Sequence, residues 1–191
     1  MLKLYGGSPS RASIVHWYLE ELSVPYEFIK LDLKSGEQRK PEFLAINPMG
    51  KVPAIVDGDL QLWESGAILL YLAEKYGKPS SVEERAKIAQ WVLFANSSLS
   101  TGIFVETNRE REMPRLMTPL NQILEQQPFI LGNEFTVADV AVGSVLGYIP
   151  MMLKLDLSAY PAVLNYIKQI AQRPAFQKSI GSGSVGAWER G

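Results

Sequence analysis

The stretch KVPAIVDGDLQLWES, residues 51–65, combines a predicted β-hairpin with two short motifs that suit a ligand. Asp57-Gly58 is a strong hairpin signal, so a strand is expected on each side of it. Val52 precedes a proline, which drives its main chain extended and leaves its N–H and C=O available to a second extended peptide. Ser65 opens an apolar periodic run, so its hydroxyl and N–H lie at a helix N-terminus, where a carboxylate is favoured. A ligand with a peptide middle and an acidic end would satisfy both motifs.

The sequence before the hairpin predicts the rest of a small α/β domain. Residues 2–5 favour a strand, and Ser10 precedes a helical pattern of apolar residues. Residues 26–33 favour a second strand, and a short helix over 41–44 has proline in its first turn. With a third helix over about 65–76, the expected order is strand, helix, strand, helix, two hairpin strands and helix.

The sequence from Ser81 onward shows helical patterns and no strand-like alternation. A capping box of Ser81 with Glu84 predicts a helix through about residue 107. Pro114 suits the first turn of the next helix, and Pro119 is expected to kink that helix. Further helix starts are predicted at the Thr-Val-Ala-Asp motif 136–139, at Pro161 and at Pro174.

These patterns divide the chain into two domains. The stretch Gly77-Lys78-Pro79-Ser80-Ser81 is polar and helix-breaking, which is typical of a linker. We expect an α/β domain over residues 1–76, a linker over 77–81, an all-helical domain over 82–180 and a flexible tail over 181–191. With 191 residues, of which 47% are hydrophobic, the chain can supply a substantial core.

The composition excludes several classes of function. The 19 Lys and Arg nearly balance the 20 Asp and Glu, and no basic run interleaves with aromatics, so nucleic acid and anionic membranes are poor partners. The chain has no cysteine and one histidine, His16, which excludes disulfides, a cysteine nucleophile and thiolate or histidine metal clusters. We therefore expect a small ligand and no metal. The sequence shows no membrane-length apolar stretch and no signal-peptide pattern, so the expected location is the cytoplasm.

The motifs together resemble those of the soluble glutathione transferases over most of the chain. The narrow match consists of Asn47-Pro48-Met49-Gly50-Lys51-Val52-Pro53 and Glu64-Ser65-Gly66-Ala67-Ile68, accompanied by the Thr-Val-Ala-Asp motif. The resemblance implies a thioredoxin-like N-terminal domain, βαβ-α-ββα, followed by a helical-bundle domain.

The resemblance also implies which residues bind glutathione. Val52, before a cis Pro53, would pair with the cysteinyl backbone of the tripeptide. Glu64 and Ser65 would hold its γ-glutamyl end. Candidates for contact with the glycine carboxylate are Gln38, Arg39 and Lys51.

Two residues are candidates for stabilising the glutathione thiolate, Ser10 and Arg11. Serine-type transferases place a serine between the first strand and the first helix, but counting back from Arg11 in theta-like patterns lands on Gly7. Ser10-Arg11-Ala12-Ser13 at this place, in a short chain without cysteine, most resembles the chi class of cyanobacterial glutathione transferases. Ser10 also fits an ordinary N-cap and Arg11 a solvated surface residue. A cation in the first turn of a helix opposes the macrodipole, however, which favours a functional role for Arg11.

The activity that the resemblance implies is conjugation of glutathione to small hydrophobic electrophiles by a homodimeric detoxification enzyme. The electrophile is expected between the first domain and the helix that carries Asn96, Leu99 and Phe104. The alternatives are a non-catalytic interaction module with the same fold and a glutathione-dependent peroxidase or isomerase. Glutathione-dependent reduction of disulfides usually relies on a protein cysteine, which this chain lacks.

Overall fold

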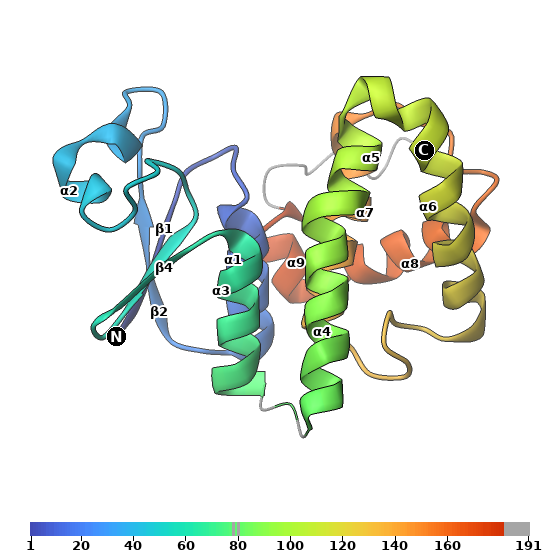
Figure 1. Cartoon of the computed structure of the whole chain (residues 1–191), viewed down its shortest axis with the longest axis horizontal. Helices are drawn as coiled ribbons and strands as arrows, with labels where there is room; N and C mark the ends of the chain where they lie inside the picture. The colour runs from blue at the N-terminus through green and yellow to red at the C-terminus, as the bar shows by residue number, and fades with distance from the viewer. Residues whose placement is uncertain (78, 80, 182–191) are drawn as a thin grey trace. The chain divides into compact units, whose positions relative to one another are not determined.

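The computed structural model describes residues 1–77, 79 and 81–181 (Figure 1). The chain divides into two units, Met1–Lys78 and Pro79–Gly191. The first unit has the thioredoxin-like arrangement of strands and helices, and the second is helical. Residues 78 and 80 of the predicted linker lie outside the described residues, as does the predicted tail from residue 182 onward.

The first unit is built on a four-stranded sheet with the strand order β2-β1-β3-β4. Its strands are β1 (Leu2–Gly6), β2 (Tyr26–Lys30), β3 (Ala54–Asp57) and β4 (Leu60–Trp63). β1 and β2 run parallel, whereas β3 is antiparallel to both β1 and β4. The predicted hairpin is confirmed, since Asp57 pairs with Leu60 and Gly58 takes a φ of 63°, which glycine adopts without a steric cost.

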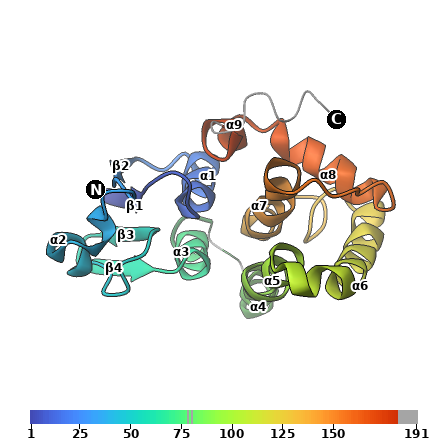
Figure 2. The same cartoon turned by 90° about the horizontal axis from the view of Figure 1, so that it is seen from above.

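Two helices lie side by side on one face of this sheet, as Figure 2 shows. They are α1 (Ala12–Leu22) and α3 (Ser65–Leu72), which continues as a π-helical turn over Ala73–Gly77. On the opposite face, Tyr5 of β1 packs against Phe43 of the short helix α2 (Pro41–Leu44), with ring centroids 5.8 Å apart. Successive strand residues point to opposite faces, so the buried Leu4 faces the two long helices.

The second strand ends earlier than the predicted residue 33. β2 stops at Lys30, and the chain turns around Asp32. The Asp32 carboxylate accepts hydrogen bonds from the N–H groups of Lys34 (3.0 Å) and Ser35 (3.2 Å). Local side-chain acceptors of this kind compete with a sheet ladder for backbone donors, which accounts for the shorter strand.

The second unit consists of six helices between Val82 and Lys178 in the described part of the chain. α4 (Val82–Phe94) passes through a π-helical turn, Ala95–Leu99, into α5 (Ser100–Phe104). The others are α6 (Glu106–Gln126), α7 (Val137–Met152), α8 (Pro161–Ala171) and α9 (Pro174–Lys178). The predicted helix starts at Pro161 and Pro174 are confirmed, and so is the Ser81 cap, whose hydroxyl accepts the Glu84 N–H at 3.1 Å.

The predicted helix start at Pro114 is wrong. α6 begins at Glu106, so Pro114 and Pro119 both lie inside the helix. One residue, Val105, separates α5 from α6 by leaving helical geometry, with φ −85° and ψ 111°. A break of one residue without glycine or proline carries no strong signal in the sequence.

Buried polar side chains fix the ends of two helices in this unit. At the start of α7, the Thr136 hydroxyl and the Asp139 carboxylate form the predicted capping box, and Asp139 also accepts the Ile130 N–H and the Tyr166 hydroxyl. At the start of α8, the Asn121 side-chain oxygen accepts the N–H groups of Ala162 (2.9 Å) and Val163 (3.3 Å). The second cap comes from α6, 41 residues earlier in the chain.

Candidate functional site

The sheet register brings four chain segments to one edge of the first unit. Gly6, the last residue of β1, pairs with Lys30, the last of β2, because these strands are parallel. Ala54, the first residue of β3, pairs with Tyr5 on one side and with Trp63, the last of β4, on the other. The predicted site residues of this unit all follow or precede these strand ends. The loop with Ser10, the segment with Gln38, the Val52-Pro53 pair and the Glu64-Ser65 pair therefore share this edge.

The Val52-Pro53 peptide bond is cis, as the resemblance implies. The turn before it is held by Asn47, a residue at 1% exposure whose side-chain amide donates to the Lys51 carbonyl at 2.6 Å. The backbone hydrogen bonds that the described residues form outside helices and strands do not involve Val52. The main chain of Val52 therefore keeps the polar groups that an extended peptide would pair with.

Glu64 has an unusual backbone conformation, with φ 70° and ψ 118°. Positive φ in a non-glycine residue costs about 1–3 kcal/mol and concentrates at functional sites. The conformation directs the chain from β4 into α3, where the Glu64 carbonyl accepts the Ile68 N–H at 3.0 Å. The Glu64 side chain is exposed, and Ser65 beside it is buried at 3% exposure. An exposed carboxylate beside a helix N-terminus can bind an ammonium and a carboxylate of one ligand together.

Ser10 is fixed to the first turn of α1. Its hydroxyl oxygen accepts the Ala12 N–H at 3.2 Å, and its carbonyl accepts the Ser13 hydroxyl at 2.9 Å. A serine hydroxyl that accepts one hydrogen bond retains its own hydrogen for donation. Arg11 follows as the residue before α1, with an exposed side chain and no acidic residue in the first turn of the helix.

The backbone at Gly7 lies very close to the segment 31–33, which the sequence does not reveal. A Cβ atom there would lie 2.7 Å from the Leu31 carbonyl oxygen and 2.6 Å from the Leu33 Cγ. A serine at this position, where theta-like patterns place one, would need the segment 31–33 to move. Ser10 and Arg11 stay the predicted residues for thiolate stabilisation.

Gln38, Arg39 and Lys51 lie near one another. A Cβ atom at Gly50, the neighbour of Lys51, would be 3.1 Å from the Gln38 carbonyl oxygen and 3.7 Å from the Arg39 Cγ. Arg39 and Lys51 have exposed side chains, so their positive charges are accessible to a carboxylate of a ligand. Gln38 differs, because its amide donates to the Leu33 carbonyl at 3.3 Å and its side-chain oxygen is buried without a hydrogen-bond partner.

The predicted second-substrate residues lie in the helical unit. Leu99 has 0% exposure in the π-helical turn, so its side chain packs in the core. Asn96 and Phe104 are partly exposed, and the Asn96 amide donates to the Val92 carbonyl at 3.1 Å.

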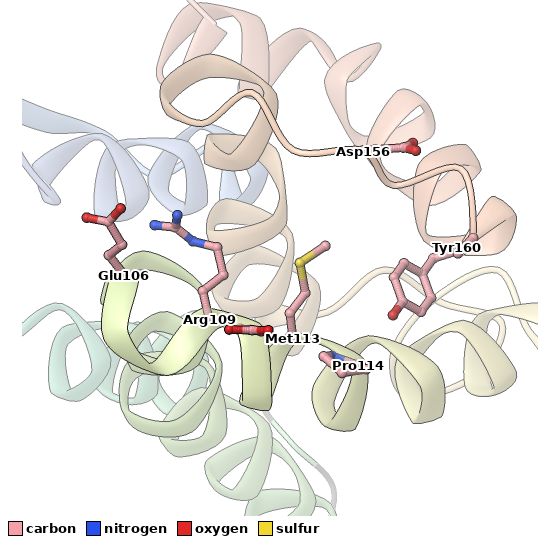
Figure 3. Close-up of a pocket in the computed structure, with 8 residues that line it drawn as sticks. Glu106, Arg109, Met113, Pro114, Asp156 and Tyr160 are labelled. Atoms are coloured by element: carbon pink, nitrogen blue, oxygen red, sulfur yellow. The ribbon is translucent and has the colours of Figure 1, made fainter.

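A cavity of about 480 Å³ lies elsewhere in this unit, between α6 and the segment that precedes α8. Figure 3 shows Glu106, Arg109, Met113 and Pro114 on α6, with Asp156 and Tyr160 across from them. The lining holds no residue that the sequence predicts for glutathione or for the electrophile. Within the described residues, no group of three or more His, Asp or Glu side chains is placed to bind a metal ion.

Comparison with known proteins decides the family. Residues 1–74 match the family model of the glutathione S-transferase N-terminal domain, and residues 85–182 match that of the C-terminal domain. The chain is a member of the glutathione S-transferase family. The predicted family and fold are thereby confirmed. Among the helices that the structure describes, none combines the length and apolarity needed to cross a membrane.

Individual relatives of this chain carry names that imply different activities. The disulfide-bond oxidoreductase YfcG of Escherichia coli is 35% identical, over 97% of both chains. The glutathione S-transferase GstB of the same species is 33% identical, over 94% of this chain and 98% of its own. Among solved structures, a glutathione transferase from Burkholderia graminis is 29% identical, with a TM-score of 0.79 over 97% of this chain and 89% of its own. That structure holds two glutathione molecules per subunit.

Proposed function

We propose that this transferase binds glutathione at the common sheet edge and conjugates its thiolate to small hydrophobic electrophiles. The observation that carries the proposal is the conjunction at one edge of the cis Val52-Pro53 peptide, the Glu64-Ser65 pair and the Ser10 loop. Val52 would pair with the cysteinyl backbone, and Glu64 with Ser65 would hold the γ-glutamyl end. Arg39, Lys51 and Gln38 would face the glycine carboxylate.

The chemical task is to ionise the bound thiol. A free thiol with a pKa near 8.5 is only about 3% ionised at pH 7, and a lowering of two pKa units requires about 2.7 kcal/mol. A hydrogen bond to a charged group contributes roughly 1.5–3 kcal/mol, so one donated hydrogen from the Ser10 hydroxyl is of the right size. A guanidinium about 5 Å away contributes about 3 kcal/mol at an effective dielectric constant near 20, so Arg11 is sufficient too.

Substitution at both positions tests the thiolate assignment. We expect Ser10→Ala or Arg11→Ala to raise the pKa of bound glutathione by about 1–2 units, since one pKa unit corresponds to 1.36 kcal/mol. Thiolate absorbance during a pH titration measures this pKa, and calorimetry measures glutathione binding. Ser8→Ala, in the same loop and exposed, is the matched control. Unchanged turnover in both variants with glutathione still bound would show that neither residue stabilises the thiolate.

A second candidate activity is glutathione-dependent reduction of disulfides. Its support is the name of the Escherichia coli relative, a disulfide-bond oxidoreductase, together with the Burkholderia structure that holds two glutathione molecules per subunit. Because this chain has no cysteine, both reducing thiols would come from glutathione. One thiolate would attack the substrate disulfide and expel one thiol. The second would attack the resulting mixed disulfide, giving oxidised glutathione and the other thiol.

A substrate panel separates the candidates. Aryl halides and isothiocyanates report conjugation, hydroperoxides and α-oxoaldehyde adducts report peroxidase and isomerase activity, and a small disulfide reports reduction. Absence of glutathione binding at millimolar concentration would instead favour a non-catalytic interaction module.

The remaining proposals concern class, assembly and location. The Ser10-Arg11-Ala12-Ser13 sequence supports a place near the chi class, and family membership supports a cytoplasmic homodimer that acts in detoxification. Light scattering checks the assembly, because a dimer has twice the 21.3 kDa mass of the chain.

A further inference from the structure

Leu33 lies where the two halves of the proposed glutathione site meet. Its side chain fills the space beside Gly7, in the loop that leads to Ser10. Its carbonyl accepts the Gln38 amide at 3.3 Å. One residue thus contacts the loop expected to stabilise the thiol and the side chain expected near the glycine end.

The segment around Leu33 is fastened on both sides. Before it, the Leu31 N–H donates to the Gly6 carbonyl at 2.7 Å, which ties the segment to the end of β1. After it, Asp32 and Glu37 bond reciprocally: the Asp32 N–H donates to the Glu37 carboxylate at 2.8 Å, and the Glu37 N–H donates to the Asp32 carbonyl at 3.2 Å. These hydrogen bonds hold the segment around Leu33 in place against Gly7.

The loop from Gly7 to Ser10 is held at both ends, by hydrogen bonds at Ser10 and by packing at Gly7. Ser10 is bonded to Ala12 and Ser13 in the first turn of α1. Gly7 packs closely against the Leu33 side chain and the Leu31 carbonyl, which occupy the space where a side chain at position 7 would lie. The position of the Ser10 hydroxyl therefore depends on packing at Leu33 as well as on the helix.

We infer that Leu33 is a positioning residue that sets the thiolate-stabilising loop through its contact with Gly7. The inference rests on the proposed function. A displacement of about 1 Å in a reacting group can cost up to 100-fold in rate, so loss of this contact should have a measurable effect without removal of any group assigned to glutathione binding.

The test uses Leu33→Ala, which removes the atoms beside Gly7 and keeps the carbonyl that binds Gln38. We expect the pKa of bound glutathione to rise by about one unit. At pH 7 a rise from about 6.5 to about 7.5 lowers the ionised fraction from about 76% to about 24%, so kcat/KM should fall roughly threefold, and closer to tenfold well below pH 6.5. The affinity for glutathione should change much less. Gln38→Ala, which releases the Leu33 carbonyl, should shift the thiol pKa in the same direction by a smaller amount.

Three comparisons separate positioning from general damage. Leu22→Ala truncates another partly exposed leucine of the same unit, at the far end of α1, and should leave the thiol pKa unchanged. Leu33→Met refills most of the space and should restore the wild-type pKa. In the Ser10→Ala, Arg11→Ala double variant, Leu33→Ala should add nothing, because the groups through which it acts are gone.

Each outcome decides the inference. A thiol pKa in Leu33→Ala equal to that in wild type, or a full shift that persists in the double variant, overturns the positioning role while the proposed function stands. If wild-type protein binds no glutathione by calorimetry, the proposed function fails first and the inference fails with it.

Discussion

At the scale of single residues, the candidate site combines features that the sequence reveals with one that it hides. Val52 and Ser65 can be predicted from their neighbours in the sequence, because a residue before proline is extended and a serine is favoured at a helix start. The Gly7–Leu33 contact gives no such signal, since it joins residues that are far apart in the sequence and depends on the missing side chain of a glycine.

The strained backbone of Glu64 gives a prediction at this scale. Glu64→Gly removes the Cβ that disfavours φ 70°, so we expect the free energy of unfolding to stay level or rise by up to about 1 kcal/mol. Glutathione affinity should nevertheless fall about 10- to 100-fold, because hydrogen bonds to a charged carboxylate are lost. Urea denaturation and calorimetry measure the two quantities.

Glu64→Ala is the matched control for this change. It loses the carboxylate but keeps the strain, so its affinity should fall equally while its stability stays below that of Glu64→Gly. Equal stability of the two variants would show that the positive φ carries no cost.

At the scale of elements, the sequence predicts starts of helices better than their breaks. The caps at Ser81 and Thr136 and the proline in the first turn at Pro161 are local patterns of a few residues, and all three predicted helix starts are confirmed. The break at Val105 involves neither glycine nor proline, and Pro114, a residue type that favours a first turn, lies inside α6. β2 shows the same limit, because its end is set by hydrogen bonds to the Asp32 side chain.

The capping box of α7 gives a prediction at this scale. Thr136→Ala removes the hydroxyl that accepts the Ala138 N–H, and we expect the free energy of unfolding to fall by about 1 kcal/mol. Asp139→Ala should cost more, roughly 3–5 kcal/mol, because the buried donors of Ile130 and Tyr166 lose their partner. Urea denaturation monitored by circular dichroism gives both values.

Asp156→Ala provides the control for these variants. Asp156 also accepts a backbone N–H, from Ser158 at 2.8 Å, but it is exposed, so its replacement should change stability by less than about 0.5 kcal/mol. If this exposed change proved as costly as Asp139→Ala, burial would not explain the effect.

At the scale of the whole molecule, tyrosines with raised pKa values occur in both units and make stability sensitive to alkali. Burial raises the pKa of Tyr18 and of Tyr26 well above the usual value, with the Glu20 carboxylate adding to the effect at Tyr26. In the helical unit, burial likewise raises the pKa of Tyr166, and Asp139 contributes. All three tyrosines keep their protons in the folded state after they would ionise in the unfolded chain.

The sign of the pH dependence follows from these shifts. Below pH 10 the tyrosines are protonated in both states, so their contribution to stability is fully present. As pH rises above about 10, the unfolded chain binds fewer protons than the folded one, and the free energy of unfolding falls by up to about 1.4 kcal/mol per pH unit for each tyrosine. Urea midpoints between pH 9 and pH 11 measure the slope. Tyr26→Phe should make it shallower, whereas an unchanged slope would contradict the role of that tyrosine.

The cap that α8 borrows from α6 has a consequence for any shortened form of the protein. If the helices were stacked in series, the last ones could be deleted and the others would keep their partners. Here, deletion from residue 160 onward would remove both N–H donors from the side-chain oxygen of Asn121, a residue with 8% exposure. The same deletion would expose the face of α6 that packs against α8. Fragment and fusion designs should therefore keep α6 and α8 in one piece.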